Sequence, residues 1–196
     1  PDAAERQRAV DHTRRAFECL GLMGGRTLLV VPGQIDPSIS YLDHWKRVVD
    51  YSRAVGEIAE EFDTVVGLEN VEARFPLSVR EWAQLIDEID HERVGMYLDV
   101  GNVVWLGLGF PEQWIDILGP RIRQVHFKDA VFGGELRNLL AGEVNWEGVA
   151  GALRRIGYNG WVSVEPAWYA HAPHRLSERL SKDLDAIFSL GSTEDE

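Results

Sequence analysis

The sequence is poor in cysteine and lacks long hydrophobic runs. Cys19 is the only cysteine among 196 residues, which excludes an intramolecular disulfide. No apolar stretch reaches the roughly 18 residues needed to cross a bilayer, and the first residues do not resemble a secretory signal. These absences fit a reducing compartment, so we expect a cytoplasmic protein.

Positive charge is also in short supply. Lys and Arg total 20 against 32 Asp and Glu, which gives a net charge of −12. Such a balance disfavours nucleic acid or an anionic membrane as the main partner. A glycine loop that could cradle phosphate is absent as well, since Gly24 and Gly25 precede a predicted strand instead of following one. A small molecule is therefore the expected partner.

No Pro-, Ser- or Gly-rich linker divides the chain. At 45% hydrophobic and 27% charged residues, the composition is that of an ordinary globular protein. We therefore predict a single domain over residues 1–190, followed by an acidic, disordered tail at 191–196.

Helical and strand patterns alternate along the sequence. After a helix at 3–20, which Gly21 should end, the pattern predicts five strands that are each followed by a helix. The predicted strands are 26–31, 64–69, 94–99, 121–126 and 161–165, and the later helices are 42–62, 78–89, 111–118, 146–156 and 175–190.

Such alternation indicates an α/β fold with a parallel sheet. Repeats of about 30 residues match a (β/α)8 TIM barrel, and a doubly wound open sheet is the competing architecture. Only about five βα units are visible, so we expect an incomplete barrel without its first three units. Its first and last strands should expose their edges.

Four of the predicted strands end in a residue type that binds metals. Because the carboxyl ends of barrel strands converge on one face, these residues should meet there. Three carboxylates without a cation would repel one another, and together with an imidazole they suit one divalent ion. Mn²⁺ is the preferred candidate, with Mg²⁺, Co²⁺ or Zn²⁺ as alternatives. The predicted ligands are Glu69, Asp99, His126 and Glu165.

Several motifs together resemble the xylose-isomerase-like TIM barrels, and more narrowly the sugar phosphate isomerase/epimerase family that includes the ketose 3-epimerases. The resemblance covers about residues 26–190. The motifs are Gly67-Leu-Glu-Asn70, Tyr97-Leu-Asp-Val-Gly-Asn102, Val125-His-Phe-Lys-Asp129, Gly142-Glu-Val-Asn-Trp146 and Gly157-Tyr-Asn-Gly-Trp-Val-Ser-Val-Glu-Pro166.

The resemblance implies that the same four residues hold one metal ion, and that Glu69 and Glu165 also act as acid and base. Some members, including the free-sugar ketose 3-epimerases, have His where this chain has Asn102. The Asp-x-Gly-Asn form is more similar to the phosphosugar branch, which leaves the substrate open between a ketose and a phosphosugar.

The expected reaction is removal of a proton next to a ketone, through a cis-enediolate that a metal ion stabilises as a Lewis acid. Lys128 could contact a substrate oxygen or pair with Asp129, and Arg137 could hold a phosphate or hydroxyl group, although solvent exposure is its blander role. Asn102 completes the candidate substrate-binding set.

Other functions stay open at this point. A related metal-dependent dehydratase uses similar chemistry, whereas a hydrolase or endonuclease on the same fold would want more His ligands and a basic face. A truncated barrel that binds a sugar without turnover is the non-catalytic alternative. The sequence also leaves a homo-oligomer open.

Overall fold

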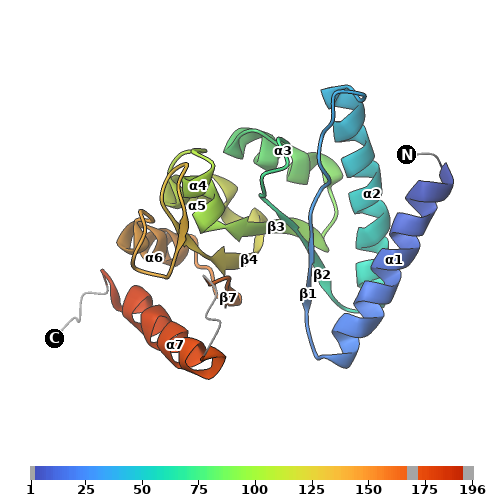
Figure 1. Cartoon of the computed structure of the whole chain (residues 1–196). Coiled ribbons are helices and arrows are strands. Elements are labelled where there is room, and N and C mark those ends of the chain that lie inside the picture. Colours follow the sequence, from blue (N-terminus) through green and yellow to red (C-terminus); the bar gives the residue numbers. More distant parts are fainter. Residues whose placement is uncertain (1–2, 167–171, 192–196) are drawn as a thin grey trace. The chain divides into compact units, whose positions relative to one another are not determined.

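The computed structural model describes residues 3–166 and 172–191. Seven helices and seven strands are assigned within these ranges, and Figure 1 labels most of them. The helices are α1 Ala3–Leu22, α2 Tyr41–Glu61, α3 Val79–Ile89, α4 Val100–Trp105, α5 Pro111–Leu118, α6 Trp146–Arg155 and α7 Pro173–Ser189, with a short 3-10 turn at Gly119–Arg121. The strands are β1 Thr27–Val30, β2 Val65–Glu69, β3 Val94–Asp99, β4 Ile122–Phe127, β5 Asp129–Ala130, β6 Leu136–Arg137 and β7 Val162–Val164.

Five strands form one sheet in the order β1-β2-β3-β4-β7. The described registers are parallel, with Glu69 opposite Tyr97 and His126 opposite Ser163. Strands joined by helices in this order give the α/β class and an incomplete TIM barrel, as predicted. β1 and β7 lie at the two edges of the sheet, and side chains near them are exposed, as Val31 (45%) and Trp161 (74%) illustrate.

The chain divides into two compact units, of which the first comprises residues 1–98 and 121–124. Here α1 and α2 lie side by side, with Thr13 hydroxyl and Tyr51 hydroxyl 2.6 Å apart (Figure 1). Phe17 on α1 is fully buried and stacks on Phe62. Val66 and Leu68 of β2 are fully buried and extend this core to the sheet. Apolar residues at helical spacing thus bury one face of each helix.

Ser78 begins α3 in the way the sequence predicts. Its side chain accepts a hydrogen bond from the backbone N–H of Glu81, and the Glu81 carboxylate accepts one from the N–H of Leu77. This is a variant of the capping box, with the return bond shifted by one residue. The predicted end of α1 at Gly21 is wrong, because the helix continues to Leu22 and the left-handed residue is Gly24.

The second unit comprises residues 99–120 and 125–196. Its core contains Trp114 on α5 and Phe127 on β4, both almost fully buried. Phe127 contacts Trp146 on α6 and Phe188 on α7, with ring centroids 4.8 and 5.7 Å apart. These contacts hold α6 and α7 against the end of β4, beside the predicted site residues.

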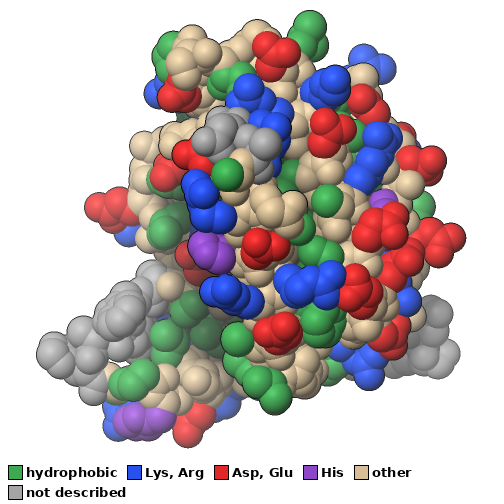
Figure 2. All heavy atoms as spheres, turned by 90° about the vertical axis from the view of Figure 1, so that its right-hand side faces the viewer, with side chains coloured by type: hydrophobic (Ala, Val, Ile, Leu, Met, Phe, Trp, Pro, Cys, Tyr) green, Lys and Arg blue, Asp and Glu red, His purple; other side chains and the backbone are tan. Residues whose placement is uncertain are grey.

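No helix in the described part of the chain is long and apolar enough to cross a membrane. On the face that Figure 2 shows, basic and acidic side chains are interspersed.

The predicted acidic tail at 191–196 lies outside the described residues except for Gly191, and the single domain over 1–190 stays a prediction.

Candidate metal and catalytic site

Asp99 ends β3 and at the same time begins α4. Its Oδ1 accepts a hydrogen bond of 2.9 Å from the backbone N–H of Asn102, which makes it the N-cap of that helix. The residue is fully buried. Oδ1 thus caps α4, whereas Oδ2 faces the side chains of Lys128 and His126.

Lys128 follows β4 and points its ammonium at Asp99. The Lys128 Nζ lies 3.1 Å from Asp99 Oδ2 and 2.5 Å from Glu165 Oε2. It also donates a hydrogen bond of 3.1 Å to Asn102 Oδ1. The ammonium thus lies among three oxygen atoms, two of which belong to carboxylates. Lys128 therefore joins two predicted metal ligands and one predicted substrate-binding residue.

The alternative partner for Lys128, Asp129, is occupied elsewhere. Asp129 is fully buried, and its carboxylate accepts hydrogen bonds from four groups in the loop after β4 and in α6. The donors are the backbone N–H groups of Ala130, Gly142 and Val144 and the indole of Trp146. The interpretation in which Lys128 simply pairs with Asp129 is therefore wrong, since the described ion pairs of Lys128 are with Asp99 and Glu165.

Burial and charge act in opposite directions on these groups. Burial raises the pKa of Asp99, and Lys128, the Asn102 N–H and His126 only partly counter it. Burial also works to lower the pKa of Lys128, but Asp99 and Glu165 outweigh it, so the Lys128 pKa lies above its ordinary value. The two carboxylates thus favour the charged form of the Lys128 side chain.

The two remaining predicted ligands in this unit differ in exposure. His126 Nδ1 lies 3.9 Å from Asp99 Oδ2, and the His126 side chain is only 15% exposed. The Glu165 side chain is 50% exposed, and Lys128 forms ion pairs with both Glu165 and Asp99. His126 thus sits against the buried carboxylate, while Glu165 stands where a small molecule can reach it.

Glu69 ends β2 as predicted and is 7% exposed. Glu69, Asp99 and His126 form a group that could hold a metal ion, since each offers a ligand atom and these atoms lie within 4.8 Å of one another. Glu165 is outside this group. Glu69, Asp99 and His126 are thus a possible divalent-metal site, and the ligand roles stay predictions.

The donor set fits a divalent cation. Within the second unit, Asp99 and Glu165 bring two negative charges, and Lys128 returns a single positive one. Carboxylate oxygens with an imidazole nitrogen are suitable ligands for hard to borderline divalent ions. The residual negative charge and the ligand types thus favour such an ion without fixing its identity.

The described ion pair of Arg137 is with a residue outside this cluster. Arg137 is on β6, exposed, and forms an ion pair of 2.8 Å with Glu135. Its predicted role in substrate binding stays a prediction. Asn102, in contrast, is 3% exposed and receives the Lys128 bond.

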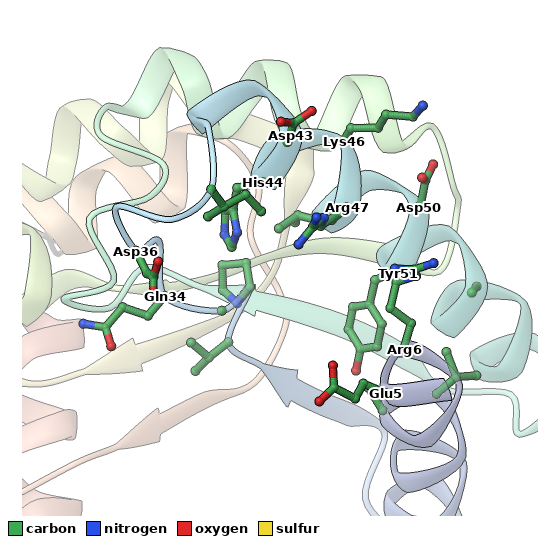
Figure 3. A pocket seen from close by; sticks show the side chains of 18 of the residues that line it. Glu5, Arg6, Gln34, Asp36, Asp43, His44, Lys46, Arg47, Asp50 and Tyr51 are labelled. Carbon is green, nitrogen blue, oxygen red and sulfur yellow. The ribbon is translucent and has the colours of Figure 1, made fainter. Parts of the chain in front are cut away.

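A cavity of about 1250 Å³ in the first unit is not built from the predicted site residues. It lies among the N-terminal part of α1, the segment after β1 and the first half of α2 (Figure 3). Acidic and basic side chains alternate around it, among them Arg6, Asp36 and Arg47. Because these groups form no convergent set of one chemistry, we place the function at the strand ends.

Comparison with known proteins places the chain in a family. The profile of the family described as xylose isomerase-like TIM barrel matches residues 1–186. The chain belongs to this family. A curated relative, the uncharacterized protein MJ1311 of Methanocaldococcus jannaschii, is 25% identical over 171 residues, or 82% of this chain. The chain spans 57% of the length of that relative.

Solved structures share the xylose isomerase-like fold. D-psicose 3-epimerase from Clostridium cellulolyticum H10, solved with D-tagatose, superposes with a TM-score of 0.78 at 21% identity, covering 97% of this chain and 73% of that one. The IolI protein, solved with a zinc atom, gives 0.83 at 19% identity, covering 96% and 72%. At these identities the likeness concerns the fold.

Proposed function

We propose that Glu69, Asp99, His126 and Glu165 hold one divalent metal ion, and that the chain carries the metal-binding part of a sugar or sugar-phosphate isomerase or epimerase. The proposal is carried by the grouping of Glu69, Asp99 and His126 as potential ligands in a chain of this family. Sugar epimerases among its structural neighbours support the substrate class. The reaction is proton transfer next to a ketone, through a cis-enediolate.

The bound metal supplies Lewis-acid stabilisation of negative charge on substrate oxygens. The half-exposed Glu165 is well placed to exchange a proton with a substrate carbon, and Glu69 is the partner acid or base. Transfer from opposite faces inverts the carbon and gives an epimer. Transfer on one face moves the carbonyl and gives aldose-ketose isomerisation.

The preferred metal is Mn²⁺, because three carboxylates to one imidazole favour a hard cation. The zinc atom in the IolI structure makes Zn²⁺ the main competitor. We expect MnCl₂ to raise the melting temperature of the metal-free protein, because an ion that binds only the folded state stabilises it. Differential scanning fluorimetry with Mn²⁺, Mg²⁺, Co²⁺ and Zn²⁺ measures this, and no shift with any of them contradicts the metal site.

Replacing Glu165 with Gln keeps the volume but removes the proton-accepting charge. We expect E165Q to lose roughly 10²- to 10⁴-fold in activity, while metal still binds through the remaining ligands. The measurement is deuterium incorporation from D₂O next to the ketone of D-psicose, D-tagatose, D-fructose and their phosphates, followed by NMR. E178Q, at an exposed position on α7, is the matched control and should retain wild-type exchange.

The outcomes separate the alternative functions. Deuterium exchange with an altered sugar indicates an isomerase or epimerase, whereas loss of water from the substrate indicates a dehydratase. Metal-dependent sugar binding without any exchange in the wild type indicates a binding protein. Equal exchange by E165Q and the wild type removes Glu165 from the proposed chemistry.

A further inference from the structure

Lys128 is the only side chain described as forming ion pairs with both Asp99 and Glu165. These are two of the proposed metal ligands. The oxygens that the ammonium contacts, Asp99 Oδ2 and Glu165 Oε2, lie at 3.1 and 2.5 Å from its nitrogen. Asp99 Oδ1 is committed to the N-terminus of α4. A metal ion bound through Asp99 Oδ2 would therefore take the oxygen that the ammonium contacts.

The ammonium is held at this place by the fold. Its side chain is 8% exposed, and it donates a hydrogen bond to Asn102 Oδ1. The backbone at Lys128 is also fixed closely, because a Cβ built at Gly101 on α4 would lie 2.5 Å from the Lys128 carbonyl oxygen. The Lys128 side chain is consequently more restricted than that of a surface lysine.

We propose that Lys128 is an internal cation that holds the ligand carboxylates together in the metal-free protein and competes with the metal ion for them. The inference rests on the proposed metal site. Without metal, the ammonium offsets the repulsion between Asp99 and Glu165. When a divalent ion binds, its charge opposes the nearby ammonium, so Lys128 weakens metal affinity and limits how much metal the site retains.

This role predicts that loss of the Lys128 charge lowers the stability of the metal-free protein and raises its affinity for a metal ion. Replacing Lys128 with Met keeps an unbranched apolar stem and removes the charge. We expect metal-free K128M to melt at a lower temperature than the metal-free wild type, since two carboxylates then face each other without a cation. We also expect its dissociation constant for Mn²⁺ to fall roughly tenfold, because a nearby like charge is removed.

The experiment titrates MnCl₂ and ZnCl₂, each alone, into metal-free wild type and K128M by isothermal titration calorimetry, beside the melting temperatures of both. K128R keeps the positive charge and should retain wild-type affinity to within about a factor of three, a difference small against the tenfold effect. K182M removes an exposed lysine on α7. It changes the net charge equally and should leave both quantities unchanged.

Each outcome decides between the two proposals. Tighter binding by K128M, or binding by K128M where the wild type binds none, supports the competing cation. Equal or weaker binding by K128M overturns it, even if the metal-free variant is less stable, and leaves the proposed metal site standing. Absence of binding by both proteins refutes the metal site and this inference with it. Should K128M not fold, K128Q takes its place in the same titration.

Discussion

At the scale of single residues, Asp129 shows how a buried carboxylate can organise a site without taking part in its chemistry. Its four hydrogen-bond donors come from the loop after β4 and from α6. Three of these donors, on Ala130, Val144 and Trp146, are buried and would otherwise be left unsatisfied. The residue therefore fixes the segment that begins next to Lys128.

We expect replacement of Asp129 by Ala to destabilise the protein by about 3 kcal/mol or more, because buried donors lose their acceptor. Asn retains one acceptor oxygen, so D129N should lie between D129A and the wild type. The free energy of unfolding is measured by urea denaturation. D185N, at an exposed position on α7, is the control and should change it by no more than about 0.5 kcal/mol. A D129A variant as stable as D185N contradicts this role.

The residue scale is also where sequence reasoning reached furthest. Glu69, Asp99, His126 and Glu165 could be proposed because each stands at a predicted strand end, and parallel strands bring such ends together. The sequence could not show that Lys128 bridges Asp99 and Glu165, since that depends on the direction of one flexible side chain. The Asx-type cap at Asp99 offered a signal that was missed, because Asp followed by a short helix is a typical N-cap.

At the scale of elements, the long helices and the strands could be predicted because their apolar periodicity is strong. Several short elements were not, among them α4 and the β5–β6 pair. Helix α4 has only six residues, too few for a helical period to emerge from the sequence. The β5–β6 pair has two residues in each strand, too few for an alternating pattern to be recognised in the sequence.

The close approach of α4 to the segment after β4 rests on Gly101. A Cβ at this position would lie 2.5 Å from the Lys128 carbonyl oxygen and 2.7 Å from its Cβ. We expect G101A to cost about 1–3 kcal/mol, as overpacking of a tight contact does. Since Lys128 must then shift, the metal affinity of G101A should also differ from that of the wild type.

Gly151 provides the matched control for this substitution. It lies on α6, where an added Cβ would meet only the end of the Arg155 side chain at 3.4 Å. G151A should therefore be neutral or stabilise the protein by up to about 1 kcal/mol through helix propensity. Urea denaturation of both variants tests the pair, and equal effects at the two positions would count against a tight contact at Gly101.

At the scale of the whole molecule, the excess of acidic residues has a physical consequence that is separate from the site. The net charge is −12, and many individual charges are paired on the surface, as Arg14 with Glu61 and Arg155 with Asp116 illustrate. Exposed pairs contribute little to stability. The unpaired remainder repels itself in the compact state.

We therefore expect added salt to stabilise the metal-free protein. Between about 10 mM and about 0.5 M NaCl the screening length falls from roughly 30 Å to below 10 Å, which suppresses long-range repulsion more than close contacts. The melting temperature should rise across this range. The charge reversals E178K and D185K, both at exposed positions on α7, together bring the net charge from −12 to −8, because each adds two positive units.

This double variant should show a smaller rise with salt than the wild type does, and KCl should act as NaCl does if screening is the cause. A melting temperature that falls with salt would mean that attractive pairs outweigh the net repulsion. An equal rise in both proteins would assign the effect to salt acting on apolar burial instead. The comparison thus separates the charge of the whole chain from the local charges around Lys128, whose effect on metal affinity should persist in the double variant.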